Sequence, residues 1–260
     1  MLVSEVVLWN CHLDEEVYEQ PMKIMKRFVR NLIIRTRLSR NITDKLIVCL
    51  SYSEFVGRIL LTTRIPHTYK DREIFWSNIV DRIGSDEPVL LLEFGVHRGE
   101  SIVWFSRKFS NPSSLFFGFD TFTGLPENWE VGNLPSGTFS CKGQEPIVDD
   151  SRVSFVKGLF SDTLPKTIDA IKVAAEGRTV LVHFDADLFS STLFVLTFLW
   201  QWLDRYYFLF DEFFGEESWA LSVFTRSYPC QLEFAASDAR SDQITVPTPN
   251  RVFGLISNSG

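Results

Sequence analysis

Two aspartates close an apolar run, and they are the first residues whose spacing suggests chemistry. Asp185 and Asp187 follow the run 180–184, with one residue between them. In a β-strand, side chains two positions apart point the same way, so an extended tip would carry both carboxylates on one side, roughly 7 Å apart. A second acidic pair, Asp211 and Glu212, ends the next apolar run. Neighbouring like charges of this kind repel, so a cation must neutralise them or some of the acids must bind protons.

A divalent cation is the expected compensating group. If the two runs are adjacent parallel strands, about 4.8 Å apart, then Asp185, Asp211 and Glu212 converge at one edge of the sheet. Carboxylate oxygens suit a hard cation, with Mg²⁺ as the default choice. The alternative is that the acids cap the helices that follow the strands. We predict a metal site formed by Asp185, Asp211 and Glu212.

A glycine-rich turn follows an earlier apolar run and can bind an anionic group. Residues 89–95 end in Glu93 and Gly95, and Gly99 comes shortly after. A strand–turn–helix of this kind presents backbone N–H groups at a helix N-terminus. His97 stands where a dinucleotide fingerprint needs a bare glycine, which argues against NAD or FAD. The spacing E-x-G-x-x-x-G instead resembles motif I of class I S-adenosylmethionine (SAM) methyltransferases, although any strand-to-helix turn can show it.

An acidic residue ends the next apolar run, 115–120. Asp120 stands 25 residues after Gly95. An acidic side chain at this place can accept hydrogen bonds from both hydroxyls of a cofactor ribose. It can also cap a helix or a turn. Position, spacing and residue type together favour ribose binding, so SAM is the expected cofactor.

These residues together suit methyl transfer to a hydroxyl group. A free hydroxyl is too weakly acidic to react readily, and a divalent cation stabilises the negative charge that develops on its oxygen. A nearby carboxylate that the metal does not use can accept the proton. We therefore predict that Asp185 is a metal ligand and that Asp187 is the general base.

Strand-like and helix-like segments alternate from about Val89 onward. The strand-like apolar runs are 89–95, 115–120, 153–158, 179–187 and 206–214, followed by 230–237 and 251–257 as two final strands in which an antiparallel arrangement is open. The helix-like segments between the first five runs are 101–109, 163–177 and 190–203. This pattern predicts an α/β fold with a mostly parallel seven-stranded sheet and helices on both faces.

The first third of the chain lacks this alternation. Residues 1–85 are predicted to form an N-terminal helical extension, and 86–260 the cofactor-binding catalytic domain. One helix is expected from an Asp71 N-cap to Ile83. Residues 22–40 hold seven Lys or Arg and no acid. Such a stretch can bind a membrane surface or nucleic acid, but a solvated helix face is the favoured interpretation.

Composition limits the classes of partner. The chain has 260 residues and a formal net charge of -7, which gives no electrostatic case for nucleic acid. No apolar window is long enough to predict a membrane span, and no signal peptide is expected. The four cysteines form no C-x-x-C motif and are expected to be reduced thiols, which predicts a cytoplasmic location. The oligomeric state is open, with a homo-oligomer included.

Five blocks occur in a characteristic order: LEFGVHRGESI, GFDTFTGLPENW, GLFSDTLP, HFDADLFSST and FDEF. Together, over about residues 62–224, they resemble the macrocin O-methyltransferase (TylF-like) family. Members of that family methylate sugar hydroxyls of antibiotic glycosides with SAM and Mg²⁺. The resemblance implies the Rossmann-like class I methyltransferase fold and a SAM-dependent O-methyltransferase that acts on a sugar or a glycosylated natural product.

The resemblance also implies roles for individual residues. It implies metal ligation by Asp185, Asp211 and Glu212 and proton transfer by Asp187; Glu212 stands where the family usually has Asp. The SAM site would be lined by Glu93, Gly95, Gly99, Ser101 and Asp120, with Phe160 and Asp162 near the adenine. Residues 121–145, rich in Gly, Pro and Trp, would form a lid over the acceptor.

Three other interpretations stay open. A catechol-type O-methyltransferase shares the cation chemistry but prefers a flat aromatic diol. A small-molecule N-methyltransferase would need no metal. A non-catalytic protein of the SAM-binding fold would act as a binding module.

Overall fold

The computed structural model of the chain describes residues 40–62, 71–238 and 249–258. The basic stretch, apart from Arg40, lies outside these ranges. The described residues from Asp44 onward form one compact unit. The domain boundary near residue 85 stays a prediction. None of the helices in the described ranges has the length and apolarity to cross a bilayer.

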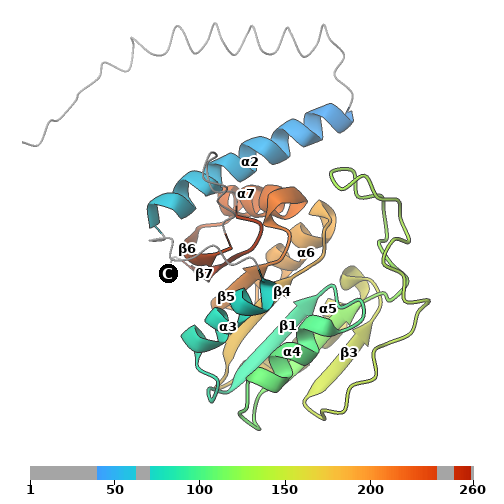
Figure 1. Cartoon of the computed structure of the whole chain (residues 1–260), viewed down its shortest axis with the longest axis vertical. Helices are drawn as coiled ribbons and strands as arrows, with labels where there is room; N and C mark the ends of the chain where they lie inside the picture. Colours follow the sequence, from blue (N-terminus) through green and yellow to red (C-terminus); the bar gives the residue numbers. More distant parts are fainter. Residues whose placement is uncertain (1–39, 63–70, 239–248, 259–260) are drawn as a thin grey trace, which may run out of the picture. The chain divides into compact units, whose positions relative to one another are not determined.

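Seven strands form one sheet in the order β3-β2-β1-β4-β5-β7-β6 (Figure 1). The strands are β1 (Val89–Phe94), β2 (Leu115–Asp120), β3 (Val153–Lys157), β4 (Thr179–Phe184), β5 (Arg205–Phe210), β6 (Cys230–Ser237) and β7 (Val252–Asn258). Strands β1 to β5 run parallel, whereas β7 is antiparallel to both of its neighbours. This order, with β7 reversed, defines the class I methyltransferase fold. The predicted fold class is confirmed.

The helices connect and cover these strands. They are α2 (Arg40–Thr62), α3 (Arg72–Ile83), α4 (Glu100–Lys108), α5 (Phe160–Ala175), α6 (Phe189–Leu199) and α7 (Ser218–Ser227), with a π-helical turn η1 (Phe213–Glu217) before α7. The predicted helix 71–83 is confirmed: the Asp71 carboxylate accepts a hydrogen bond from the Glu73 backbone N–H at 2.8 Å, and Gly84 ends the helix with a φ of 102°. No pattern in the sequence predicted η1 or α7.

Alternate side chains of β1 enter two different cores. Leu90, Leu92 and Phe94 pack in the cluster that α2, α5, α6 and α7 share. Val89 and Leu91 pack on the opposite face against α3 and α4. Both faces of the sheet are therefore shielded from solvent, as is typical of apolar parallel strands. Glu93 follows the same alternation and is fully buried.

The segment between β2 and β3 is the longest connection in the described chain, and it runs along the side of the sheet where β3 lies, as the green to yellow-green trace of Figure 1. It folds back on itself through a short antiparallel bridge between Trp129 and Leu134. Two backbone hydrogen bonds brace it further, from Leu125 to Thr138 at 2.9 Å and from Gly137 to Leu125 at 2.8 Å. The predicted lid region is thus an ordered loop.

Candidate active site

The carboxyl ends of the central strands meet at one edge of the sheet. The Asp185 N–H donates to the Phe94 carbonyl at 2.9 Å, and the Asp211 N–H donates to the Phe184 carbonyl at 3.0 Å. These bonds continue the pairing of β4 with β1 and β5 for one residue past the strands. The acidic residues therefore stand beside the glycine-rich turn, as the parallel-sheet argument requires.

Gly95 is needed where the turn passes β4. Its φ is 98°, and a Cβ added to it would lie 1.9 Å from the Asp185 carbonyl oxygen. Both the backbone conformation and the close approach exclude any other residue without local rearrangement. The turn and the acidic strand tip are thus in direct backbone contact.

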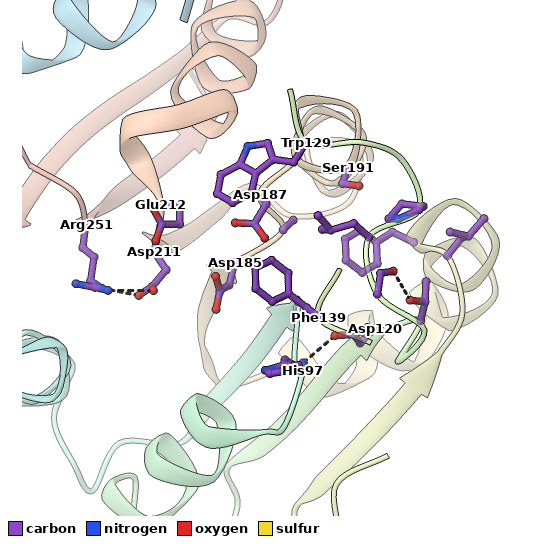
Figure 2. Close-up of a pocket in the computed structure, with 18 of the residues that line it drawn as sticks. His97, Asp120, Trp129, Phe139, Asp185, Asp187, Ser191, Asp211, Glu212 and Arg251 are labelled. Atoms are coloured by element: carbon purple, nitrogen blue, oxygen red, sulfur yellow. Dashed lines mark hydrogen bonds and ion pairs between the residues drawn. The ribbon is translucent and has the colours of Figure 1, made fainter. Parts of the chain in front are cut away.

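A cavity of about 310 Å³ opens at this edge. Seven of the predicted site residues line it: Gly95, Asp120, Phe160, Asp185, Asp187, Asp211 and Glu212. Further lining residues come from the glycine-rich turn, the lid, α3, α6 and the segment before β7, among them Arg72, His97, Leu125, Trp129, Phe139, Ser191 and Arg251. Figure 2 shows the acids on one side and the aromatic rings of Trp129 and Phe139 facing them.

The other four predicted site residues lie outside the cavity lining. Glu93 is buried behind it, where one carboxylate oxygen accepts a hydrogen bond from the Ser101 hydroxyl at 3.0 Å and the other lies 3.0 Å from His183 Nδ1. Gly99 is the N-cap of α4, with a φ of 78°. Asp162 lies in the first turn of α5. Roles for these residues in cofactor binding stay predictions.

The buried His183 is in hydrogen-bond contact with Glu93, a contact that was not predicted from the sequence. Burial alone would lower the pKa of His183, but the hydrogen bond and the negative charge of Glu93, with those of Asp185 and Asp211, raise it. The contact therefore favours a charge-assisted pair directly beneath the acidic edge. Its Nε2 atom has no hydrogen-bond partner among the described residues.

Asp120 binds backbone N–H groups on both sides of the cavity mouth. One of its oxygens accepts hydrogen bonds from Val96 and His97, both at 2.8 Å, and the other accepts one from Phe122 at 2.7 Å. The side chain thus fixes the glycine-rich turn against the beginning of the lid. It also lines the cavity, and a carboxylate has acceptor capacity for about four hydrogen bonds. The ribose role predicted for Asp120 is compatible with these contacts.

The two aspartates after β4 differ in backbone conformation. The strand ends at Phe184, and Asp187 has a φ of 61°, so the extended form does not continue through both residues. Burial, followed by the negative charge of Asp211, raises the pKa of Asp185 well above its usual range. Burial and the charges of Glu212, Asp211 and Glu216 raise the pKa of Asp187 to about 7. A carboxylate with a pKa near neutrality is suited to accept a proton.

Two further glutamates accept hydrogen bonds from backbone N–H groups of this region, and neither was predicted from the sequence. Glu217 is fully buried and accepts hydrogen bonds from the N–H groups of Ala186 at 3.2 Å and Glu212 at 3.3 Å. Glu216 accepts from Phe189 at 2.8 Å and from the lid residue Val131 at 3.5 Å. Burial raises the pKa of both glutamates. The signal that could have identified them is the dense run of acids from 211 to 217 in an otherwise aromatic segment.

Arg251 was also missed, because a single arginine at the start of a predicted strand has no distinctive pattern. Its Nε lies 2.7 Å from Asp211 Oδ1 and its Nη2 lies 3.3 Å from Asp211 Oδ2. Its Nη1 lies 2.9 Å from Asp238 Oδ2. The guanidinium thus bridges Asp211, which lines the cavity, and the buried Asp238; Figure 2 shows its contact with Asp211.

The donor set fits a hard divalent cation in its chemistry. Asp185, Asp187, Asp211 and Glu212 all offer oxygen to one cavity, and oxygen donors suit such a cation. Their spacing is not that of a closed metal site: within the described ranges, no three Asp, Glu, His or Cys side chains gather closely enough to hold a metal ion. The two oxygens of Asp211 are bound by Arg251.

Comparisons of the sequence with known proteins gave no match. No protein-family profile matches the chain, and no curated protein matches it either. The resemblance to macrocin O-methyltransferases is therefore not confirmed and stays a hypothesis.

Solved structures with a similar fold include NovP, an O-methyltransferase from Bacillus cereus and cmcI. The chain is 19% identical to the O-methyltransferase NovP, covering 84% of this chain and 100% of that one, with a TM-score of 0.45. For an O-methyltransferase from Bacillus cereus in complex with SAH, the identity is 12%, the coverage 80% and 91%, and the TM-score 0.44. For cmcI, whose structure is named as an Mg-SAM structure, the identity is 13%. The match covers 74% of this chain and 73% of that one, and the TM-score is 0.42. Likenesses at this level carry no argument about the activity of this chain.

Proposed function

We propose that this protein is a SAM-dependent O-methyltransferase of the class I fold and that its acceptor is a hydroxyl of a sugar or a glycosylated natural product. The observation that carries the proposal is a single cavity lined by Gly95, Asp120 and the carboxylates of Asp185 and Asp187. It unites a turn suited to the cofactor's carboxylate, an acid suited to its ribose and a base suited to the acceptor. The sequence blocks shared with macrocin O-methyltransferases support the choice of acceptor.

The chain's own residues supply proton transfer and positioning. The acceptor oxygen attacks the methyl carbon of SAM, the bond from this carbon to the sulfonium sulfur breaks, and the sulfur keeps the electron pair, which releases S-adenosylhomocysteine. The hydroxyl proton passes to the Asp187 carboxylate. A pKa near 7 leaves a large share of Asp187 ionised at neutral pH, so it can accept that proton.

A divalent cation, with Mg²⁺ as the first candidate, is part of the proposal. Asp185, Asp211 and Glu212 would hold it. When bound, such a cation stabilises the negative charge that develops on the acceptor oxygen. The four acidic side chains that follow β4 and β5 in the cavity offer oxygen only, which suits a hard cation better than a softer one.

The lid side of the cavity favours an acceptor with a ring. Leu125, Pro126, Trp129 and Phe139 supply apolar and aromatic surface to the same cavity. A sugar ring can lie against such a surface, and so can a flat aromatic diol. A catechol-type acceptor is therefore the second candidate, favoured by Trp129 and Phe139.

Transfer of a labelled methyl group from SAM to a panel of acceptors tests the proposal. The panel should contain free and glycosidic sugars, catechols and amines, each with added Mg²⁺ or with EDTA. We expect O-methyl sugar products that disappear with EDTA and return with Mg²⁺. Label in catechols alone would favour the second candidate. Full activity toward amines with EDTA would favour an N-methyltransferase without a metal, and SAM binding without any transfer would favour a binding module.

We also propose a reducing, cytoplasmic setting. Cys49, Cys141 and Cys230, the cysteines in the described ranges, are free thiols. Free thiols of this kind are typical of proteins kept in a reducing compartment.

A further inference from the structure

Arg251 places a positive charge within the group of carboxylates that should bind the divalent cation. Its side chain is 14% exposed, and that of Asp211 is 6% exposed. The fork of Nε and Nη2 engages both oxygens of Asp211. A two-point contact of this kind is among the stronger ion pairs in proteins. In Figure 2, Arg251 and Asp211 lie side by side, with Asp185 and Glu212 next to them.

Asp238 anchors Arg251 from the other side. Besides accepting from Nη1 at 2.9 Å, it accepts a hydrogen bond from the Arg251 backbone N–H and one at 2.8 Å from the Asn250 N–H. The whole residue is buried, with 2% of its surface exposed. Arg251 therefore keeps a charged partner and a fixed backbone even when its contact with Asp211 is lost.

The contact has a direct consequence for cation binding. A divalent cation at this edge needs Asp211, whose oxygens are engaged by the guanidinium. Resting on the divalent cation of the proposed function, we propose that Arg251 is a resident counter-cation of Asp211, that it competes with the divalent cation for this carboxylate, and that Asp238 draws Arg251 away from it. The affinity for the metal is thus set by how Arg251 is shared between two aspartates.

The alternative is that Arg251 strengthens binding of the divalent cation. A side chain that holds a metal ligand in place by a hydrogen bond normally strengthens metal binding, and its removal weakens binding by about 10–100-fold. A competing cation does the reverse. The direction of the change on removing Arg251 therefore decides between the two.

Binding of Mn²⁺, an oxygen-preferring substitute for Mg²⁺, can be followed on the full chain from the electron paramagnetic resonance signal of the free ion. We expect Arg251→Met to bind Mn²⁺ about tenfold more tightly than the wild type. This size is typical of changes to a residue that contacts a metal ligand. Arg251→Lys keeps a cation and should stay close to the wild type. Asp238→Asn should bind Mn²⁺ several-fold more weakly, because Arg251 then has only Asp211 as a charged partner.

A matched control is Arg72→Met, which removes a positive charge from the same cavity. Arg72 is paired with Glu100 at 2.6 Å, and not with the carboxylates at the strand tips. A small effect in this variant and a large one in Arg251→Met would show that the contact with Asp211, and not the general charge of the cavity, controls binding. Equal effects in both variants would contradict the proposal.

Equal or weaker Mn²⁺ binding by Arg251→Met would overturn the proposal, provided that its circular dichroism and unfolding temperature match those of the wild type. If that variant does not fold, Asp238→Asn decides, since tighter or unchanged binding by it would also overturn the proposal. If no variant binds Mn²⁺ at millimolar concentration, the proposal fails together with the cation of the proposed function. SAM binding by calorimetry then tells whether the methyltransferase part still stands.

Discussion

Asp187 combines a conformation and an environment that set it apart from the other acids. Its left-handed backbone conformation, with a φ of 61°, is one that Asp and Asn tolerate better than most residues. Its carboxylate lines the cavity beside Ser191 and Glu212. A residue held in a sparsely populated conformation at a cavity wall is a reasonable candidate for a chemical role.

Asp187→Asn should remove the base and keep the shape of the site. Asparagine has nearly the same volume and tolerates the same backbone conformation, so the fold should be unchanged. We expect the turnover rate to fall by roughly 10²–10⁴-fold, with the affinity for SAM nearly unchanged. Single-turnover kinetics and calorimetry on the same preparation measure both. Near-normal turnover would assign the proton transfer to another group, and His97 in the cavity would be the next to test.

The protonation of Asp187 should be visible at neutral pH. Because burial and the neighbouring charges raise its pKa to about 7, the base form should decline as the pH falls through 7. We expect ¹³C NMR of protein labelled at its aspartate carboxyl carbons to show one group that titrates near pH 7 and is absent from Asp187→Asn. A bound divalent cation should move this titration to lower pH, since positive charge favours the ionised form. A titration near pH 4 without any cation would contradict the account.

Among the elements, the glycine-rich turn depends on Asp120 for its shape. This side chain accepts three backbone hydrogen bonds, two from the turn and one from the start of the lid. It thus links β1, β2 and the lid at the place where the cofactor is proposed to bind.

Asp120→Ala should therefore lose stability as well as affinity for SAM. Each hydrogen bond to a charged acceptor contributes on the order of 1.5–3 kcal/mol, so the unfolding temperature should fall even without cofactor. Thermal unfolding and calorimetry test the two effects separately. Weaker SAM binding with an unchanged unfolding temperature would leave only the ribose role, and unchanged values of both would remove Asp120 from the site.

The central strands were predictable from the sequence because helices cover both faces of the sheet. The stretches 89–92 and 180–182 are continuously apolar, since parallel strands covered on both faces bury both rows of side chains. The helix 71–83 was predictable from the Asp71 cap and from Gly84. The turn η1 was not, since non-helical conformations at Phe214 and Gly215 interrupt it, and a five-residue segment has no helical period to detect.

At the scale of the whole molecule, the cavity forms from segments far apart in the sequence. Gly95, Asp120, Asp185 and Asp211 meet because parallel strands end at the same edge, and this part of the site follows from the predicted topology. Arg251 comes from the segment before the antiparallel β7, and its contact with Asp211 spans 40 residues. Such a contact depends on the tertiary arrangement alone, so no local pattern could have predicted it.

The central claim is that this fold uses SAM, and calorimetric titration of the full chain with S-adenosylhomocysteine, SAM and NAD tests it most directly. We expect one binding site for S-adenosylhomocysteine and for SAM, weakened in Asp120→Ala, and no heat of binding with NAD, because His97 stands where the pyrophosphate of NAD would need a glycine. Binding of NAD, with no binding of SAM or S-adenosylhomocysteine by a folded preparation, would contradict the account.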